Sequence, residues 1–105
     1  MNDPGELNDL VLLQTPGTMQ DAAGQPLATW TTVARVWADV RYQTGLERVR
    51  AGAVSTVVQA SVRIRWRPGV TPAQRLVLDG RPMAIKSVLP DREKEHLDLV
   101  CEELQ

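Results

Sequence analysis

The chain has no phenylalanine and only one tyrosine, one histidine and one cysteine among its 105 residues. A single cysteine cannot form an internal disulfide. A single histidine offers at most one imidazole to a metal site or a catalytic triad, which argues against an enzyme. The glycines are dispersed at turns and match no phosphate-binding pattern. The sequence therefore predicts no catalytic residue, no metal site and no cofactor.

Long hydrophobic runs are also missing. No segment approaches the length needed to span a bilayer, and no basic stretch followed by an apolar one stands at the N-terminus. We therefore expect a soluble protein that is not exported and has no membrane partner. Cys101 alternates with Leu97 and Leu99, so we expect it to be a small core residue. As a lone cysteine it implies no more than tolerance of a reducing compartment.

The size and patterning of the chain favour one mostly β domain. At 43% hydrophobic content, the chain can bury one modest core. We expect residues 1–6 to be a flexible N-terminal arm and 7–105 to form a single domain. The expected fold is all-β: a small antiparallel β-barrel of about six strands with one short helix in a long inter-strand loop, because closure removes exposed sheet edges.

Two runs alternate with period 2 and predict long strands at 32–42 and 60–67. The inward faces are predicted to carry Val36, Ala38, Val40 and Tyr42 in the first run, and Ala60, Val62, Ile64 and Trp66 in the second. Further strands are expected at 10–13, buried on both faces, and at 76–78, 83–89 and 96–102. The Asp79-Gly80 pair predicts a type I′ hairpin turn, and the prolines and glycines of 16–26 predict a loop.

The segment 43–59 separates the two long strands. Thr44 and Glu47 fit a capping box, in which each side chain satisfies a backbone N–H group at a helix start. This predicts one or two helical turns, weakened by Gly45 and Gly52. We expect the segment to be a mobile, basic insert that a rigid barrel presents to a partner.

Charge is distributed unevenly, although the net charge is only −1. Residues 35–81 hold nine arginines against three acids, while 1–34 and 82–105 carry net charges of −4 and −3. These opposite charges could pair within one domain or between neighbouring copies, and the sequence does not choose between the two.

Few side chains are candidates for recognition. Trp37 lies on the polar face of its strand and is either an exposed anchor or the cap of a second small core. Arg63, Arg65 and Arg67 form a strip that either pairs with acids of a neighbouring strand, which we favour, or contacts a protein partner or DNA. His96 is expected to be solvated, and the acids near the C-terminus to be a surface that binds no metal.

A series of short motifs follows in a fixed order along the chain: Gly24-Gln25-Pro26, Thr29-Trp30, Val36-Trp37-Ala38, Thr44-Gly45-Leu46-Glu47, Val62 to Pro72 and Asp79-Gly80-Arg81. This ordered set resembles the small head-tail joining proteins of long-tailed phages, which are also called head-closure, stopper or head-tail adaptor proteins. The resemblance extends from about Leu7 to Glu102, and none of its motifs is catalytic.

The resemblance implies a small β-barrel that acts in the virion, after assembly in the cytoplasm of the bacterial host. Its implied partners are the portal/adaptor complex, a tail-end protein and further copies of itself in a homo-oligomeric, dodecameric ring through which packaged DNA passes. In such proteins the segment matching 43–59 reaches toward the central channel. Because Glu47, Arg48 and Arg50 lie in the matching segment, the resemblance makes them candidates for channel or intersubunit contacts.

Our hypothesis from the sequence is a structural virion protein that forms a ring at the head-tail interface, closes the portal channel after DNA packaging and provides the tail-docking surface. The isolated protein is expected to be a monomer until a preceding ring templates it. The alternative is a small β-barrel that binds nucleic acid through its arginine strand face, and the scarcity of stacking aromatics argues against it.

Overall fold

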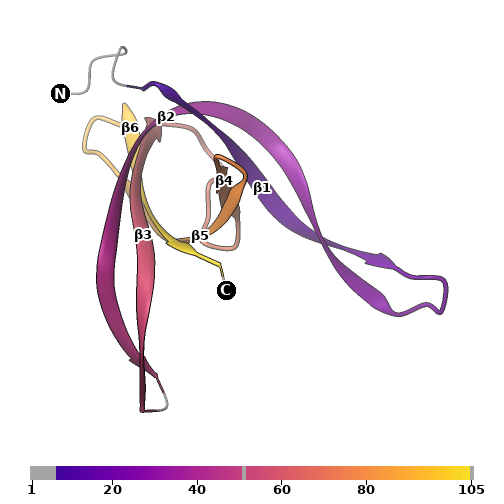
Figure 1. Cartoon of the computed structure of the whole chain (residues 1–105). Coiled ribbons are helices and arrows are strands. Elements are labelled where there is room, and N and C mark those ends of the chain that lie inside the picture. Colours follow the sequence, from indigo (N-terminus) through magenta and orange to yellow (C-terminus); the bar gives the residue numbers. More distant parts are fainter. Residues whose placement is uncertain (1–6, 51, 105) are drawn as a thin grey trace.

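In the computed structural model, which describes residues 7–50 and 52–104, six antiparallel strands close into a barrel (Figure 1). They are β1 (Asp9–Gln20), β2 (Pro26–Arg50), β3 (Ala53–Arg65), β4 (Arg75–Leu78), β5 (Arg81–Pro90) and β6 (His96–Glu103). Around the barrel the order is β1-β2-β3-β6-β5-β4, with β4 returning to β1. The expected β-barrel fold is confirmed, and the described residues contain no helix that could cross a membrane.

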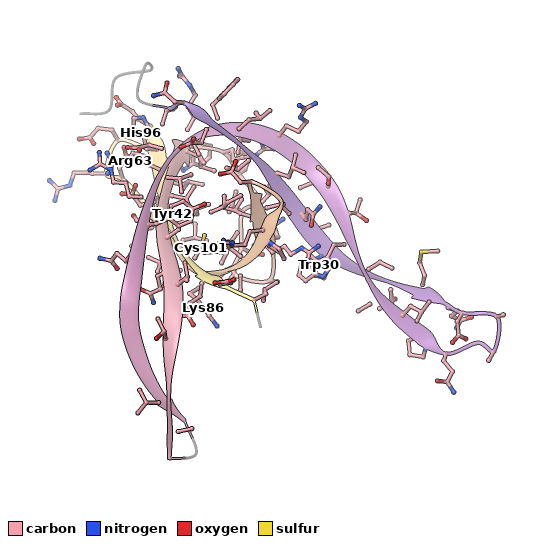
Figure 2. The ribbon with its side chains drawn as sticks, viewed as in Figure 1. Trp30, Tyr42, Arg63, Lys86, His96 and Cys101 are labelled. Carbon is pink, nitrogen blue, oxygen red and sulfur yellow. The ribbon has the colours of Figure 1, made fainter. Side chains whose placement is uncertain are left out.

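The barrel is filled by apolar side chains from all six strands, which form one continuous core. Fully buried members include Leu13, Val62, Leu76, Met83 and Leu99. Cys101 lies among them, as expected, near the middle of the barrel in Figure 2. Bulges interrupt β1–β2, β2–β3 and β5–β6 pairing, and such bulges bend strands enough to help close a small sheet.

The hairpin between β4 and β5 turns at Asp79 and Gly80, as the sequence predicts. Their φ angles of 52° and 77° are both positive, and Leu78 pairs with Arg81 across the turn. Asparagine, aspartate and glycine tolerate these angles better than other residues, which explains why this short motif is so informative.

Two pairs of strands continue beyond the barrel as projecting ribbons (Figure 1). The β1–β2 ribbon consists of 15–20 and 26–31, and the β2–β3 ribbon consists of 43–50 and 53–58. The first replaces most of the loop expected at 16–26, which is reduced to a turn at 21–25. The second replaces the helix expected after Thr44: that prediction is wrong, because Leu46 and the residues after it pair with β3.

Alternation predicted the inward faces of the long strands with two exceptions. Ala38, Ala60, Val62 and Ile64 are buried as expected. Trp66, which the sequence places in the core, is 39% exposed, because it lies beyond the end of β3 at Arg65. Tyr42 is also exposed, at one mouth of the barrel. In β1, Leu10 is exposed while Val11 and Leu13 are buried, so that strand is not buried on both faces.

Candidate interaction surfaces

The arginine strip of β3 is largely an intramolecular arrangement. The Nε atom of Arg63 donates to Asp98 Oδ1 at 2.6 Å, and its Nη2 atom donates to Asp98 Oδ2 at 3.0 Å. The hydrogen bond to Asp98 raises the pKa of the Arg63 guanidinium. Because β3 pairs with β6 at this register, the acid lies directly opposite the arginine. For Arg63, pairing with an acid of the neighbouring strand is therefore what the structure shows.

The other two arginines of the strip are placed differently. Arg65 is exposed and lies opposite His96 in the β3–β6 register. Arg67 lies beyond the end of β3 and is partly buried, and its buried Nε atom has no hydrogen-bond partner among the described residues. The sequence spacing suggested that the three side chains form one strip. In the structure they do not form one uniform cationic face. A groove beside Arg63, which the other two arginines do not line, is bordered by Asp39, Arg41, Ser61, Arg63, Leu89, Asp98 and Val100.

Trp37 is an exposed aromatic side chain on the outer wall of the barrel. It is 57% exposed and pairs across the strands with Leu10, which is also exposed. Of the two alternatives for Trp37, the structure therefore favours the exposed position over the cap of a second core. Exposed tryptophans are frequent anchors in protein interfaces.

Trp30 belongs to an intramolecular cluster that the alternation of the sequence did not predict. The guanidinium of Arg75 lies 4.4 Å from the centre of the Trp30 ring, and Arg75 Nε donates to Gln14 Oε1 at 2.7 Å. These contacts fix the base of the β1–β2 ribbon against β4. Arg75 is distant from Trp30 and Gln14 in the sequence, so only the tertiary fold reveals the cluster.

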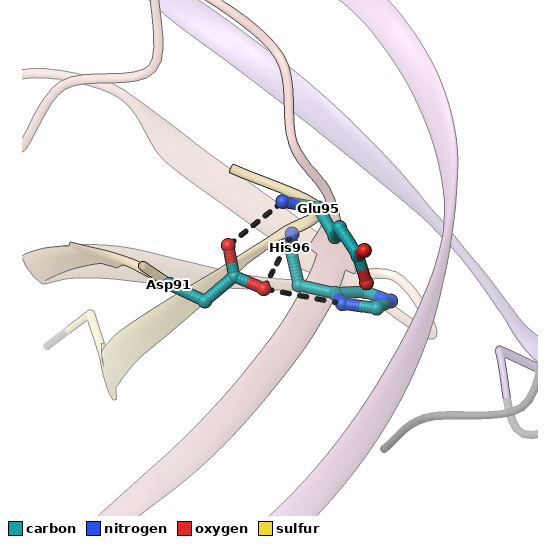
Figure 3. Close-up of side chains that lie close together, drawn as sticks. All are labelled: Asp91, Glu95 and His96. Carbon is teal, nitrogen blue, oxygen red and sulfur yellow. Dashed lines mark hydrogen bonds and ion pairs between the residues drawn. The ribbon is translucent and has the colours of Figure 1, made fainter. Parts of the chain in front are cut away.

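Asp91, Glu95 and His96 come together in the turn between β5 and β6 (Figure 3). One ligand atom from each lies within 4.8 Å of the others, so the group could hold a cation. The Asp91 carboxylate, however, accepts hydrogen bonds from the backbone N–H groups of Glu95 at 2.7 Å and His96 at 3.2 Å. This arrangement serves to hold the turn. His96 is not solvated as expected, since only 17% of its side chain is exposed.

The pKa of the Asp91 carboxyl lies below its usual value for a clear physical reason. Partial burial opposes ionisation, but the two backbone hydrogen bonds and the neighbouring His96 outweigh it. His96 Nδ1 lies 3.6 Å from Asp91 Oδ2. The Asp91 carboxylate makes these contacts to Glu95 and His96 of the same turn, so we assign the pair to turn stability.

A small hollow at one mouth of the barrel is lined by polar and apolar groups. Its lining consists of Asp9, Asp79 and Tyr42 together with the apolar residues Leu10, Val11, Val40 and Leu78. Burial and the charge of Asp79 raise the pKa of the Tyr42 phenol, and Arg81 partly opposes them. No described histidine or cysteine lines this hollow.

The candidates Glu47, Arg48 and Arg50 are on the β2–β3 ribbon. The structure describes the backbone of this segment as strand, and the side chains of 44–50 lie outside the described residues. Their proposed contacts therefore stay predictions. The ribbon itself extends well away from the barrel wall (Figure 1).

Comparison with known proteins gives one consistent result at the level of the sequence. A family model described as phage head completion protein matches residues 2–104. The head completion protein gp7 of Enterobacteria phage HK97 is 33% identical over 79 residues, which cover 74% of this chain and 70% of that protein.

Solved structures show the same fold. A chain from the virion of a native gene transfer agent particle is similar with a TM-score of 0.71 and 27% identity, over 91% of this chain and 93% of that one. Protein SF1141 from Shigella flexneri 2a is similar with a TM-score of 0.66 and 25% identity, over 97% and 96%. The similarity includes almost the whole of both chains.

Proposed function

Because this chain belongs to the phage head completion protein family, we propose that it is a structural protein of the virion that joins the head to the tail. The observation that carries the proposal is the family match over nearly the full chain, supported by a similar chain in a solved virion particle. In this role the protein forms a ring under the portal complex after DNA packaging. The ring closes the channel and offers a surface on which the tail docks.

The geometry of the barrel supports binding in place of catalysis. The core is filled by side chains, so the barrel is a rigid body and not a container for a substrate. Rigid walls with projecting strands suit a protein that connects larger parts, because such a body transmits a contact from one face to another. The exposed Trp37–Leu10 pair provides one candidate contact face on the outer wall.

The β2–β3 ribbon is the segment we assign to the channel. It projects from the barrel as two paired strands and carries Arg48 and Arg50 in its sequence. Directed inward in a ring, these arginines would surround the channel with positive charge next to the packaged DNA. Glu47 on the same ribbon would then contact a basic group of an adjacent copy.

The alternative function is a barrel that binds nucleic acid through its arginine face. The structure supports it less well than the structural role, because arginines of this region are paired with acids. Arg63 is already paired with Asp98, and Arg41 lies 3.3 Å from Asp39. A salt series with short DNA separates the two functions. Tight binding by the isolated chain with a steep salt dependence would favour the alternative, whereas a structural ring component binds weakly as a monomer.

Deletion of the gene, with complementation by a plasmid copy, tests the proposed function. We expect lysates without the protein to contain DNA-filled or leaking heads and free tails, and few joined particles by electron microscopy. The plasmid copy should restore joined particles. Normal joined particles in the deletion strain would overturn the proposal.

A further inference from the structure

The β1–β2 ribbon (15–20 and 26–31) has two open edges. β4 pairs with β1 only along Leu12, Leu13 and Gln14, and β3 pairs with β2 only from Ala38 onward. Each ribbon strand is therefore hydrogen-bonded to the other along one side and has no strand partner on its other side within the described chain. An open edge presents unpaired N–H and C=O groups to any strand that approaches it.

The ribbon also lacks the charges that normally protect such edges. Between Gln14 and Ala34 the only charged residue is Asp21. Its carboxylate accepts hydrogen bonds of 2.9 Å from the N–H groups of Ala23 and Gln25, so it caps its own turn. Near the tip, Met19 pairs with Leu27, and these side chains are 63% and 47% exposed. Exposed apolar side chains on an uncharged ribbon are typical of a surface that binds another protein.

The absence of charge indicates what the ribbon contacts. Different proteins recognise each other in large part through complementary charges, which this ribbon does not offer. A second copy needs no charge complement, because the free β1 edge and the free β2 edge of the ribbon are both uncharged and one copy can supply each half of an antiparallel pair.

We propose that the β1–β2 ribbons of neighbouring copies pair edge to edge, with the free edge of β1 in one copy hydrogen-bonded to the free edge of β2 in the next. The inference rests on the proposed function, since it describes how the proposed ring is held together. The two edges are different surfaces of one protomer, which is the condition for a head-to-tail contact that can close into a ring. Because β1 and β2 run in opposite directions, rotation about a ring axis makes each new pair antiparallel.

Two prolines define the length of this contact. Pro16 and Pro26 have no N–H group to donate to a neighbouring strand. Pro16 therefore bounds the pairing segment of β1 at its barrel side and Pro26 bounds that of β2 near the tip, which leaves 17–20 and 27–31 of the ribbon for the contact. Contacts of this length are too small to hold a stable dimer by themselves, which agrees with a monomer that assembles only on a preformed platform.

A cysteine scan in assembled particles tests the inference. One copy carries Thr18→Cys on the β1 edge, and a co-expressed copy carries a cysteine in place of Leu27, Ala28, Thr29 or Thr31 on the β2 edge. The two cysteines are in separate chains, so every disulfide between them joins two protomers. The native Cys101 does not interfere because its thiol is buried in the core.

After mild oxidation, we expect a disulfide dimer of this chain for alternate scan positions, because side chains of paired strands share a face at every second residue. The Thr18→Cys copy alone should give no dimer. A matched control pairs Thr18→Cys with Thr56→Cys, an exposed position on the other ribbon, and should also give none. Incorporation of every variant is measured by the amount of the chain in purified particles.

The outcomes separate the two proposals. Particles that contain the chain but yield no dimer at any scan position overturn the ribbon contact and leave the proposed function intact. Dimers from Thr18→Cys alone, or a disulfide to a protein of different mass, overturn it as well, because the contact would then be symmetric or made to another partner. Tailed particles that lack the chain altogether overturn the proposed function and the ribbon contact together.

Discussion

The single cysteine of this chain shows how burial controls the chemistry of a residue. Cys101 is fully buried in the barrel, and burial raises the pKa of its thiol to about 12. A thiol reacts through its thiolate form, so a buried neutral thiol is inert. The sequence predicted this position correctly from its alternation with Leu97 and Leu99.

We expect Cys101 to resist thiol reagents at pH 8 in the folded protein and to react completely after denaturation. Mass spectrometry after a timed exposure to iodoacetamide measures both states. Because the pKa of the thiol is raised in the folded state, the neutral thiol stabilises the folded protein at pH values below the usual thiol pKa. This stabilisation decreases as the pH rises above the usual thiol pKa. Rapid labelling of the folded protein at neutral pH would contradict the core position.

The Asp91 carboxyl gives the opposite pH dependence. Its pKa is lowered in the folded state, so its stabilising effect is present above the usual carboxyl pKa of about 3.9 and is lost as the pH falls through the lower, folded value. We expect Asp91→Ala to unfold at a lower urea concentration than the wild type at pH 7. This difference should shrink at pH 3 and below.

A matched control for Asp91 is Glu93→Ala, because Glu93 is an exposed acid of the same turn. This control should unfold like the wild type at both pH values. An Asp91→Ala difference that stays constant from pH 7 to pH 2 would show that the carboxylate does not hold the turn through its charge.

At the scale of elements, the β4–β5 turn is the clearest link between a short motif and the fold. Gly80 has a φ angle of 77°, in the left-handed region where a side chain is strained. We expect Gly80→Val to lower the free energy of unfolding by about 1–2 kcal/mol, because a β-branched residue is disfavoured there. Urea denaturation followed by circular dichroism measures the change.

The matched control for the turn is Asp79→Asn. Asparagine adopts positive φ angles as readily as aspartate, so this variant should differ from the wild type by less than about 0.5 kcal/mol. Equal stability of Gly80→Val and the wild type would mean that the turn does not have the type I′ geometry.

The two ribbons show why some elements could not be predicted from the sequence. Pro16 and Gly17 indicate a loop by composition, yet they pair with Trp30 and Thr29 across the strands. The capping box at Thr44 is a local signal, and the pairing of Leu46 with Val57 overrides it. In both places the outcome depends on strand pairing, which single-residue preferences do not contain.

The β2–β3 ribbon carries a functional prediction. We expect the double variant Arg48→Glu/Arg50→Glu to remain folded and to yield few infectious particles, because the ribbon projects from the barrel and its charges would act in the assembled ring. Circular dichroism checks the fold, and plaque counts with a complementing plasmid measure assembly. A matched charge reversal, Arg92→Glu/Lys94→Glu in an exposed turn, should leave the plaque count near the wild-type value.

If the Arg48→Glu/Arg50→Glu variant instead unfolded the isolated protein, the ribbon would contribute to the stability of the core. Its assignment to the channel would then be wrong.

At the scale of the whole molecule, the uneven charge of the sequence is partly resolved within the fold. β3 carries basic residues and its neighbour β6 carries acids, and Arg63 and Asp98 meet across them. The pair is about one-third exposed on both sides, so its contribution to stability is small, on the order of 1 kcal/mol or less. The sequence showed the two opposite charges but could not place them in register.

The shape of the molecule agrees with a connecting role. Its radius of gyration is 15.5 Å, whereas a compact chain of this length has about 13 Å. The difference reflects the two ribbons, which extend beyond the barrel (Figure 1). The alternation of the sequence predicted the barrel but did not predict the two ribbons. Our proposals assign these ribbons to assembly.

The most direct test of the central claim is an electron cryo-microscopy reconstruction of the neck of the tailed particle that contains this protein. We expect a ring of six-stranded barrels between the portal and the tail, with adjacent β1–β2 ribbons in contact and the β2–β3 ribbons toward the channel. A neck without this barrel, or the barrel located on the head shell away from the portal, would contradict the claim.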